Sequence, residues 1–213
     1  GVSAKDEKIP ELPIVALAED EVTLPVVAHA AAAPQPKTMV KKEEWQRWND
    51  YGIGLLLQGD LKGAAAAFQK ITEADPSNPD GWVNIGRCAV QEGDMARART
   101  VLEKALQLSP KLARANFFYA KVLRSDGNYE GAAARLRAVL EQYPRDRVAL
   151  NDLGRILFLQ RKYPEAVKVL ESVLAIDPED LQAHYNLMLC YNGLGQEKLA
   201  KEHEERYLRF KAD

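Results

Sequence analysis

The sequence is poor in the residues that build metal centres and catalytic sites. Its 213 residues include only two cysteines and three histidines. The histidines are His29, His184 and His203, and none has another histidine four residues away, as a helical zinc motif requires. Gly52 and Gly54 do not form a phosphate-binding loop, and no serine lies in a nucleophile elbow. We therefore expect no enzyme activity, no metal and no cofactor.

Long apolar runs and an excess of one charge are also absent. The sequence has no run of about 18 apolar residues, so we expect no membrane-spanning helix. The formal net charge is -2 and the pI is about 6.0, which predicts no general attraction for nucleic acid. The chain starts at Gly1 without a methionine. From this we expect a processed chain or a fragment of a longer one.

An internal repeat is the strongest feature that is present. Pro76, Pro110, Pro144 and Pro178 follow one another at intervals of 34 residues. A unit of this length without a strand pattern holds two short helices and two turns, and it cannot bury its apolar face alone. The sequence therefore predicts an all-α solenoid of stacked helix pairs.

Other columns of the repeat become visible once the prolines are aligned. We number each repeat from the residue 31 positions before its proline, and a fifth repeat without a proline follows Asp180. Positions 8 and 20 hold small residues, which indicates that two helices cross closely there. Positions 24 and 27 are apolar. The columns read Gly52, Gly86, Ala120 and Gly154 at position 8, Ala64, Ala98, Ala132 and Ala166 at position 20, and Phe68, Leu102, Leu136 and Leu170 at position 24.

These columns closely resemble the tetratricopeptide repeat (TPR) family. The resemblance covers residues 45 to 213 and implies a right-handed superhelix of helix-turn-helix units with a concave ligand groove. Two positions depart from the pattern, because Asn116 replaces the usual Trp and Arg161 replaces the turn glycine of the other repeats. We expect an arm and linker at residues 1–40 and a TPR domain at 41–213, with repeats at about 45–78, 79–112, 113–146, 147–180 and 181–213.

The repeat also predicts the individual helices and their ends. First helices are expected at 45–58, 79–92, 113–126, 147–160 and 181–194, and second helices at 61–74, 95–108, 129–142, 163–176 and 197–211. Gly59 suits the left-handed position that ends a helix, and Asp60, Asp94 and Asn128 are candidate caps. Glu204 occupies an otherwise apolar position, so helix 197–211 is expected to cap the solenoid.

The two cysteines occupy the same repeat position. Cys88 and Cys190 lie 102 residues apart, which is three repeats. Stacked helices are roughly 8–10 Å apart, whereas a disulfide needs Cα atoms within about 7 Å. We therefore predict two small core residues and no disulfide. Neither cysteine begins a Cys-x-x-Cys-His motif, so no haem attachment is expected within this chain.

Residues 1 to 36 differ in composition from the repeats. They contain five prolines, and their six carboxylates outnumber two lysines, so the segment is acidic. One interpretation is a linker to an upstream domain. The other is an extended arm that docks on a protein surface, because two of its stretches are apolar. The residues expected to dock are Ile14, Leu17, Val22, Leu24 and Val26.

The resemblance implies that certain first-helix positions line the groove. Laid on this chain, they give a set rich in basic, amide and aromatic side chains, with few acids such as Asp50, Asp80 and Asp152. Such a set favours an extended, acidic or carboxylate-ended peptide, although solvated helix faces are the alternative. The predicted groove residues are Asn84, Arg87, Arg114, Phe117, Lys121, Arg124, Asn151, Arg155, Phe158, Tyr185 and Asn186. The acidic arm could itself lie in such a basic groove, its own or that of a neighbour.

The function expected from these features is a non-catalytic protein-interaction scaffold that binds an acidic peptide segment. The alternative is a structural subunit of a larger assembly or filament, in which the arm docks on a neighbouring protomer. Stretches 48–60, 183–190 and 207–213 also resemble, more weakly, TPR tails attached to bacterial multi-haem c-type cytochromes. That resemblance implies a bacterial protein that works in the periplasm or outside the cell and carries no haem itself. A cytoplasmic location is the alternative.

Overall fold

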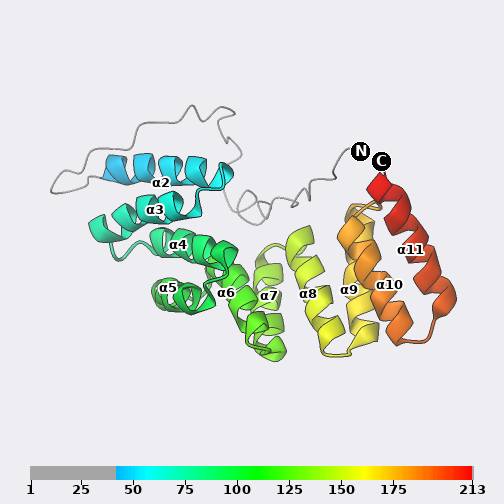
Figure 1. Ribbon diagram of the computed structural model, residues 1–213. Coiled ribbons are helices and arrows are strands. Elements are labelled where there is room, and N and C mark those ends of the chain that lie inside the picture. Colours follow the sequence, from blue (N-terminus) through cyan, green and yellow to red (C-terminus); the bar gives the residue numbers. More distant parts are fainter. Residues whose placement is uncertain (1–41, 213) are drawn as a thin grey trace. The chain divides into compact units, whose positions relative to one another are not determined.

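The computed structural model describes residues 42–212, which form ten α-helices and no strand (Figure 1). The residues predicted to dock the arm, Ile14, Leu17, Val22, Leu24 and Val26, lie outside this range. The all-helical prediction is confirmed for the described part of the chain. None of its helices is long and apolar enough to cross a membrane.

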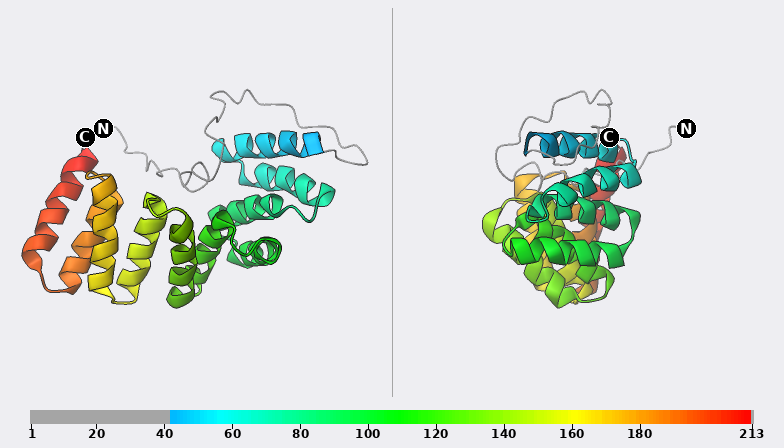
Figure 2. Two further views of the ribbon diagram at one scale, coloured as in Figure 1. Left: turned by 180° about the vertical axis from the view of Figure 1, so that it is seen from behind. Right: turned by 90° about the vertical axis from the view of Figure 1, so that its left-hand side faces the viewer.

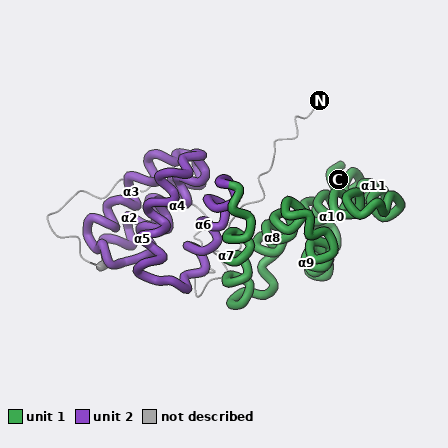
Figure 3. Tube along the Cα trace, turned by 90° about the horizontal axis from the view of Figure 1, so that it is seen from below, with its two compact units in different colours: residues 1–22, 127–213 green, residues 23–126 purple. Residues whose placement is uncertain are grey.

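The described residues divide into two compact units (Figure 3). Unit 2 contains residues 42–126 and unit 1 contains residues 127–212. The helices of unit 2 are α2 (Lys42–Leu57), α3 (Leu61–Ala74), α4 (Pro79–Glu92), α5 (Met95–Leu108) and α6 (Ala113–Ser125). Those of unit 1 are α7 (Tyr129–Gln142), α8 (Arg147–Leu159), α9 (Tyr163–Ile176), α10 (Leu181–Gly193) and α11 (Glu197–Ala212). Every helix begins and ends within three residues of its predicted bounds.

Within each unit, helices that follow one another in the sequence pack side by side (Figure 2). The even-numbered helices are the first helices of the repeats and the odd-numbered ones are the second helices. In unit 2, α3 contacts α2 and α4, and α5 contacts α4 and α6. In unit 1, α9 contacts α8 and α10. Connections of a few residues suffice for this arrangement, since neighbours in sequence are neighbours in space.

Close helix crossing explains the small residues at position 8. A Cβ atom added to Gly86 would lie 2.5 Å from Cγ of Leu102, and one added to Gly154 would lie 2.5 Å from Cδ2 of Leu170. Both leucines are fully buried. The side chain at position 24 therefore lies directly on the glycine backbone of the partner helix, which agrees with the close helix crossing predicted from the small residues at position 8.

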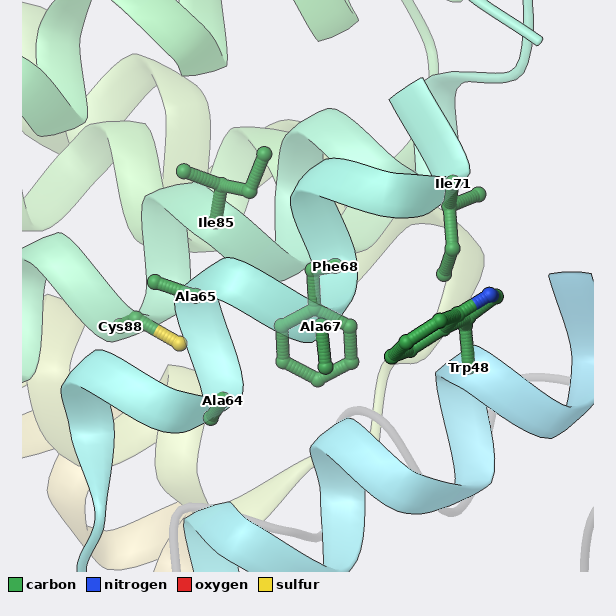
Figure 4. Close-up of a cluster of buried hydrophobic side chains, with 8 residues drawn as sticks. All are labelled: Trp48, Ala64, Ala65, Ala67, Phe68, Ile71, Ile85 and Cys88. Carbon is green, nitrogen blue, oxygen red and sulfur yellow. The ribbon is translucent and has the colours of Figure 1, made fainter. Parts of the chain in front are cut away.

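The core of unit 2 shows how three successive helices share one apolar interior (Figure 4). Trp48 of α2 packs over α3, whose Phe68 and Ile71 are almost completely buried, and Cys88 reaches the same cluster from α4. Cys88 and Cys190 are free and buried, as predicted. Burial raises the pKa of the Cys88 thiol to about 12 and that of Cys190 to about 11, so both stay protonated and inert at neutral pH.

The helix ends follow the predicted turn chemistry. Asp60, Asp94 and Asn128 each accept a hydrogen bond from a backbone N–H in the first turn of a second helix, as predicted. The turn glycines Gly59, Gly93, Gly127 and Gly195 have φ between 70° and 81°. Arg161 adopts the same left-handed conformation with φ of 59°, although a side chain makes this conformation unfavourable.

Arg161→Gly is expected to stabilise unit 1 by about 0.5–1 kcal/mol, because glycine adopts this backbone conformation without steric cost. The arginine side chain is exposed, so few packing contacts are lost. The midpoint of urea unfolding measures the change. Arg161→Ala is the matched control, since it removes the same side chain but keeps a Cβ atom at positive φ. Equal stabilisation by both substitutions would show that backbone strain is not the cause.

The residues at position 4 of three repeats make equivalent hydrogen bonds, each to the carbonyl of the proline six residues earlier. Trp82 Nε1 donates to the Pro76 carbonyl at 2.9 Å, and Asn116 Nδ2 donates to the Pro110 carbonyl at 3.0 Å. His184 Nε2 makes the corresponding bond to the Pro178 carbonyl at 2.9 Å. These different side chains all place an N–H donor within hydrogen-bond distance of the carbonyl of the proline six residues earlier. Asn116 in place of tryptophan therefore preserves the hydrogen bond and does not disturb the fold.

Candidate functional site

In unit 2, the predicted binding residues lie on α4 and α6. Asn84 and Arg87 are buried, and Phe117 is fully buried, so its ring is part of the core. Lys121 Nζ lies 4.7 Å from the Phe117 ring centroid, and both Lys121 and Arg124 are half-buried. Among the predicted binding residues of this unit, positive charge therefore reaches solvent mainly through the partly exposed side chains of α6.

A hydrogen-bonded network ties three of the helices of unit 2 together. Asn84 Nδ2 of α4 donates to Asn49 Oδ1 of α2 at 2.9 Å, and Arg114 of α6 donates to Asn84 Oδ1. Arg114 also lies 3.6 Å from a carboxylate oxygen of Asp80. The Arg114 side chain is 16% exposed, so part of its charge is already balanced inside the network. Sequence reasoning missed Asn49, although it occupies the same repeat position as Asn151.

In unit 1, the predicted binding residues lie on α8 and α10. Arg155 places its guanidinium 5.1 Å from the centroid of the Phe158 ring. Asn151 Nδ2 donates to Asp180 Oδ1 at 3.1 Å. Tyr185 is 40% exposed, and its ring lies 5.5 Å from that of Tyr207 on α11. Sequence reasoning did not assign Tyr207 to this surface, because Tyr207 stands in a second helix.

Two histidines meet at the contact between α10 and α11. His184 is fully buried and His203 is half-buried, and their Nδ1 atoms are 2.8 Å apart. Because His184 Nε2 faces a carbonyl oxygen, it must carry a proton, which leaves Nδ1 of His184 as the acceptor and Nδ1 of His203 as the donor. Burial, followed by the neighbouring His184, lowers the pKa of His203 from 6.5 to about 4. His203 is therefore neutral at pH 7.

The sequence offered no sign of this pair, since the two residues are 19 positions apart and belong to different helices. Tyr191 stacks on His203 with ring centroids 5.5 Å apart, and Phe210 lies 5.5 Å from His184. Within residues 42–212, no group of three or more His, Cys, Asp or Glu side chains is placed to hold a metal ion. The observed contacts of the pair are hydrogen bonds and ring packing.

Two family models match the chain. The model for the TPR domain of cytochrome c-type biogenesis protein H matches residues 56–184, which is more than half of the chain. A tetratricopeptide repeat model matches residues 157–213. Together the two matches cover all five repeats at least in part.

Curated relatives share the repeats but are longer. Human aspartyl/asparaginyl beta-hydroxylase is 24% identical over 204 residues, which cover 85% of this chain and 27% of the relative. Type IV pilus assembly protein PilF from Pseudomonas aeruginosa is 30% identical over 132 residues, which cover 61% of this chain and 52% of PilF. The chain thus spans between about a quarter and about half of the length of these relatives.

Solved structures show the same fold. MamA from Desulfovibrio magneticus RS-1 superposes with a TM-score of 0.72 at 21% identity, covering 81% of this chain and 97% of MamA. YrrB, described as a TPR protein with an unusual peptide-binding site, has a TM-score of 0.66 at 22% identity, covering 81% of this chain and 89% of YrrB. Repeat pattern, helix order and family models agree. The chain therefore belongs to the tetratricopeptide-repeat family, and residues 56–184 are a TPR domain of the cytochrome c-type biogenesis protein H type.

Proposed function

We propose that the protein is a non-catalytic interaction scaffold that binds an extended, acidic peptide segment of a partner protein along its first helices. The observation that carries this proposal is the recurrence of basic, amide and aromatic side chains at equivalent first-helix positions in both units. Arginine binds carboxylates through two parallel hydrogen bonds, and asparagine amides can pair with main-chain groups. Such a surface recognises an extended chain with acidic side chains.

The related proteins are consistent with this class of function. YrrB is described as having a peptide-binding site, and PilF is named for its role in pilus assembly. One relative, the beta-hydroxylase, is named as an enzyme. The present chain spans only 27% of that enzyme, and the side chains on its first helices suit binding rather than chemistry. We therefore extend only the interaction role to this protein.

Selection of a random dodecamer peptide library on the 213-residue chain tests the proposal. Peptides rich in Asp and Glu should be enriched, and fluorescence polarisation should show weaker binding as salt rises, because screening reduces the attraction of exposed charges. Arg114→Glu with Lys121→Glu reverses two charges in unit 2, and Arg155→Glu reverses one in unit 1. We expect at least one of these two variants to bind the selected peptide about tenfold more weakly than the wild-type protein does.

A matched variant separates local contacts from overall charge. Arg97→Glu with Lys104→Glu makes the same charge change as the unit 2 variant but places it on the exposed face of α5. This control should retain its affinity. Absence of any enriched peptide, or equal affinities in all variants, would contradict the proposed function.

The second candidate is a structural subunit whose acidic arm docks on a neighbouring copy. It is favoured by the charge difference between the arm, with its six carboxylates and two lysines, and the basic side chains of α6. The mass of the intact protein by light scattering, compared with the mass after deletion of residues 1–36, decides between the two. If deletion of the arm converts an oligomer into a monomer, the role as a structural subunit is favoured. For either role we propose a location in the bacterial periplasm or outside the cell.

A further inference from the structure

Contacts between neighbouring repeats join one side of a second helix to one side of the first helix that follows it. A Cβ atom added to Gly81, at position 3 of α4, would lie 2.8 Å from Cγ2 of Thr72, at position 28 of α3. Ala183 and Leu174 hold the same two positions in α10 and α9, and they belong to one core cluster. Position 3 of a first helix therefore faces position 28 of the preceding second helix.

The contact between α5 and α6 adds polar interactions on the same side. The hydroxyl of Tyr119, at position 7 of α6, donates to Glu103 Oε1, at position 25 of α5, at 2.7 Å. Arg99, at position 21 of α5, places its guanidinium carbon 6.0 Å from the centroid of the Tyr119 ring. Leu106, at position 28, is 9% exposed. A basic residue, a glutamate and a leucine of the second helix thus surround a tyrosine of the first.

The first and the last helix of the described chain carry the same residues. Helix α11 has Lys201, Glu205 and Leu208 at positions 21, 25 and 28, and α2 has Tyr51 at position 7. Among the described helices, only α5 shares this set with α11, and only α6 shares the tyrosine with α2. Leu208 is 57% exposed, because no first helix follows α11 within residues 42–212. Each of the two helices therefore presents one half of a contact like that between α5 and α6.

Two charges of opposite sign distinguish these outer helices from the inner ones. Arg47 is exposed at position 3 of α2, and Glu204 is exposed at position 24 of α11. Glu204 stands one turn before Leu208 and on the same side of α11. An extended arginine side chain spans about one helical turn, about 5.4 Å, so Arg47 placed opposite Leu208 would reach the carboxylate of Glu204. In the other first helices, position 3 is buried and is occupied by Gly81, Ala115, Ala149 and Ala183.

We propose that the outer side of α11 binds the outer side of α2 in a second copy of this chain, in the same way as α5 binds α6. Tyr51 of one copy donates to Glu205 of the other, and Lys201 lies over the tyrosine ring. Leu208 becomes buried against α2, and Arg47 pairs with Glu204. The two sides are different surfaces, so each added copy leaves one free α2 and one free α11, and copies can join end to end. Because each copy contributes one helix face, the association is weak and depends on concentration.

Two variants, each blocked on one side, test this inference in the 213-residue chain. Leu208→Arg places a second cation opposite Arg47 and blocks α11, whereas Arg47→Glu places a carboxylate opposite Glu204 and blocks α2. In sedimentation velocity, the average mass of the wild-type protein should rise with concentration above the 23.8 kDa of one chain. Each variant alone should remain at the mass of one chain.

Mixing the two variants in equal amounts should restore association. The Arg47→Glu protein keeps an intact α11, and the Leu208→Arg protein keeps an intact α2, so they bind each other but cannot add a third copy. The mixture should therefore stop at two chains, which also shows that both variants are folded. Tyr51→Phe, which removes only the hydroxyl group that donates to Glu205, should weaken association of the otherwise wild-type chain about tenfold.

Leu199→Arg is the matched control for the block on α11. Leu199 is also an exposed leucine of this helix, but it occupies position 19. In α9 this position is Glu165, which lies 3.8 Å from Arg137 of the preceding second helix and so faces away from the following repeat. The Leu199→Arg protein should associate as the wild-type protein does.

The proposed contact uses neither the peptide-binding surface of the first helices nor the arm, so its failure leaves the proposed function standing. A wild-type protein that keeps the mass of one chain at every concentration would overturn the inference. Association of either blocked variant with itself, or a mixture that does not associate, would do the same. If deletion of residues 1–36 abolishes association, the arm is the binding element and the assignment to α2 is wrong. Association that persists after this deletion supports it.

Discussion

Leu170→Ala is expected to lower the free energy of unfolding by about 3 kcal/mol, within the range of about 2–5 kcal/mol found for such substitutions in cores. Leu170 on α9 is fully buried. Its side chain lies on the backbone of Gly154, where an added Cβ would come within 2.5 Å of Cδ2. Truncation therefore opens a cavity at the crossing of α8 and α9. Neither helix can close it without moving away from its other neighbours.

Thermal unfolding followed by circular dichroism measures this effect. For a chain of this size, a loss of about 3 kcal/mol lowers the Tm by roughly 6–12 °C. Leu208→Ala is the matched control, because Leu208 is also a leucine of a second helix but is 57% exposed. It should change stability by less than about 0.5 kcal/mol. Similar shifts for the two substitutions would mean that position 24 does not hold the helix pair together.

Acidification from pH 7 to pH 5 is expected to destabilise the contact between α10 and α11 through His203. The folded pKa of about 4 lies below the ordinary value of 6.5. Between these values the unfolded state binds more protons than the folded state, so the contribution of His203 is complete above pH 6.5 and is lost progressively as the pH falls toward 4. Because His203 is only half-buried, solvent screening limits the loss to about 1 kcal/mol at pH 5.

The environment of His203 explains why its charged form is unfavourable. The rings of His184 and Tyr191 of α10 pack against the ring of His203, and Nδ1 of His184 accepts the hydrogen bond from Nδ1 of His203. Arg206 on the same helix opposes a further positive charge, and Glu202 favours it more weakly. Ala200 is the one buried side chain of α11 among the described residues, and Tyr207 and Phe210 add ring contacts with Tyr185 and His184 of α10.

His203→Gln removes the titrating group while keeping a side chain that can donate a hydrogen bond to His184. Urea unfolding at pH 7 and pH 5 measures how far the free energy of unfolding falls on acidification. This fall should be about 1 kcal/mol larger for the wild-type protein than for the variant. All other titrating groups are common to the two proteins, so they cancel in this comparison. An identical pH dependence of the two proteins would rule out His203 as the source.

The candidate binding residues show where reasoning from the sequence reaches its limit. The repeat register assigned Phe117 to a ligand-binding surface, but the structure buries its ring completely. Helical periodicity gives the direction of a side chain to within part of a turn. A residue at the boundary between the exposed and the buried face of a helix can therefore point either to a ligand or to the core. Which of the two it does depends on how closely the neighbouring helices approach. For the same reason, the sequence did not reveal that Asn49 accepts a hydrogen bond from Asn84.

The sequence by itself determined the fold, the ends of the helices, the left-handed turns, the caps of the second helices and the burial of the two cysteines. These features depend on local chemistry repeated every 34 residues, and repetition makes a local signal unmistakable. Only the tertiary structure decided that Asn84 bonds to Asn49 whereas Asn151 bonds to Asp180, and that His184 meets His203. These contacts join side chains from different helices, and their hydrogen bonds depend on distances and on competing partners such as Asp180 that spacing along the chain does not encode.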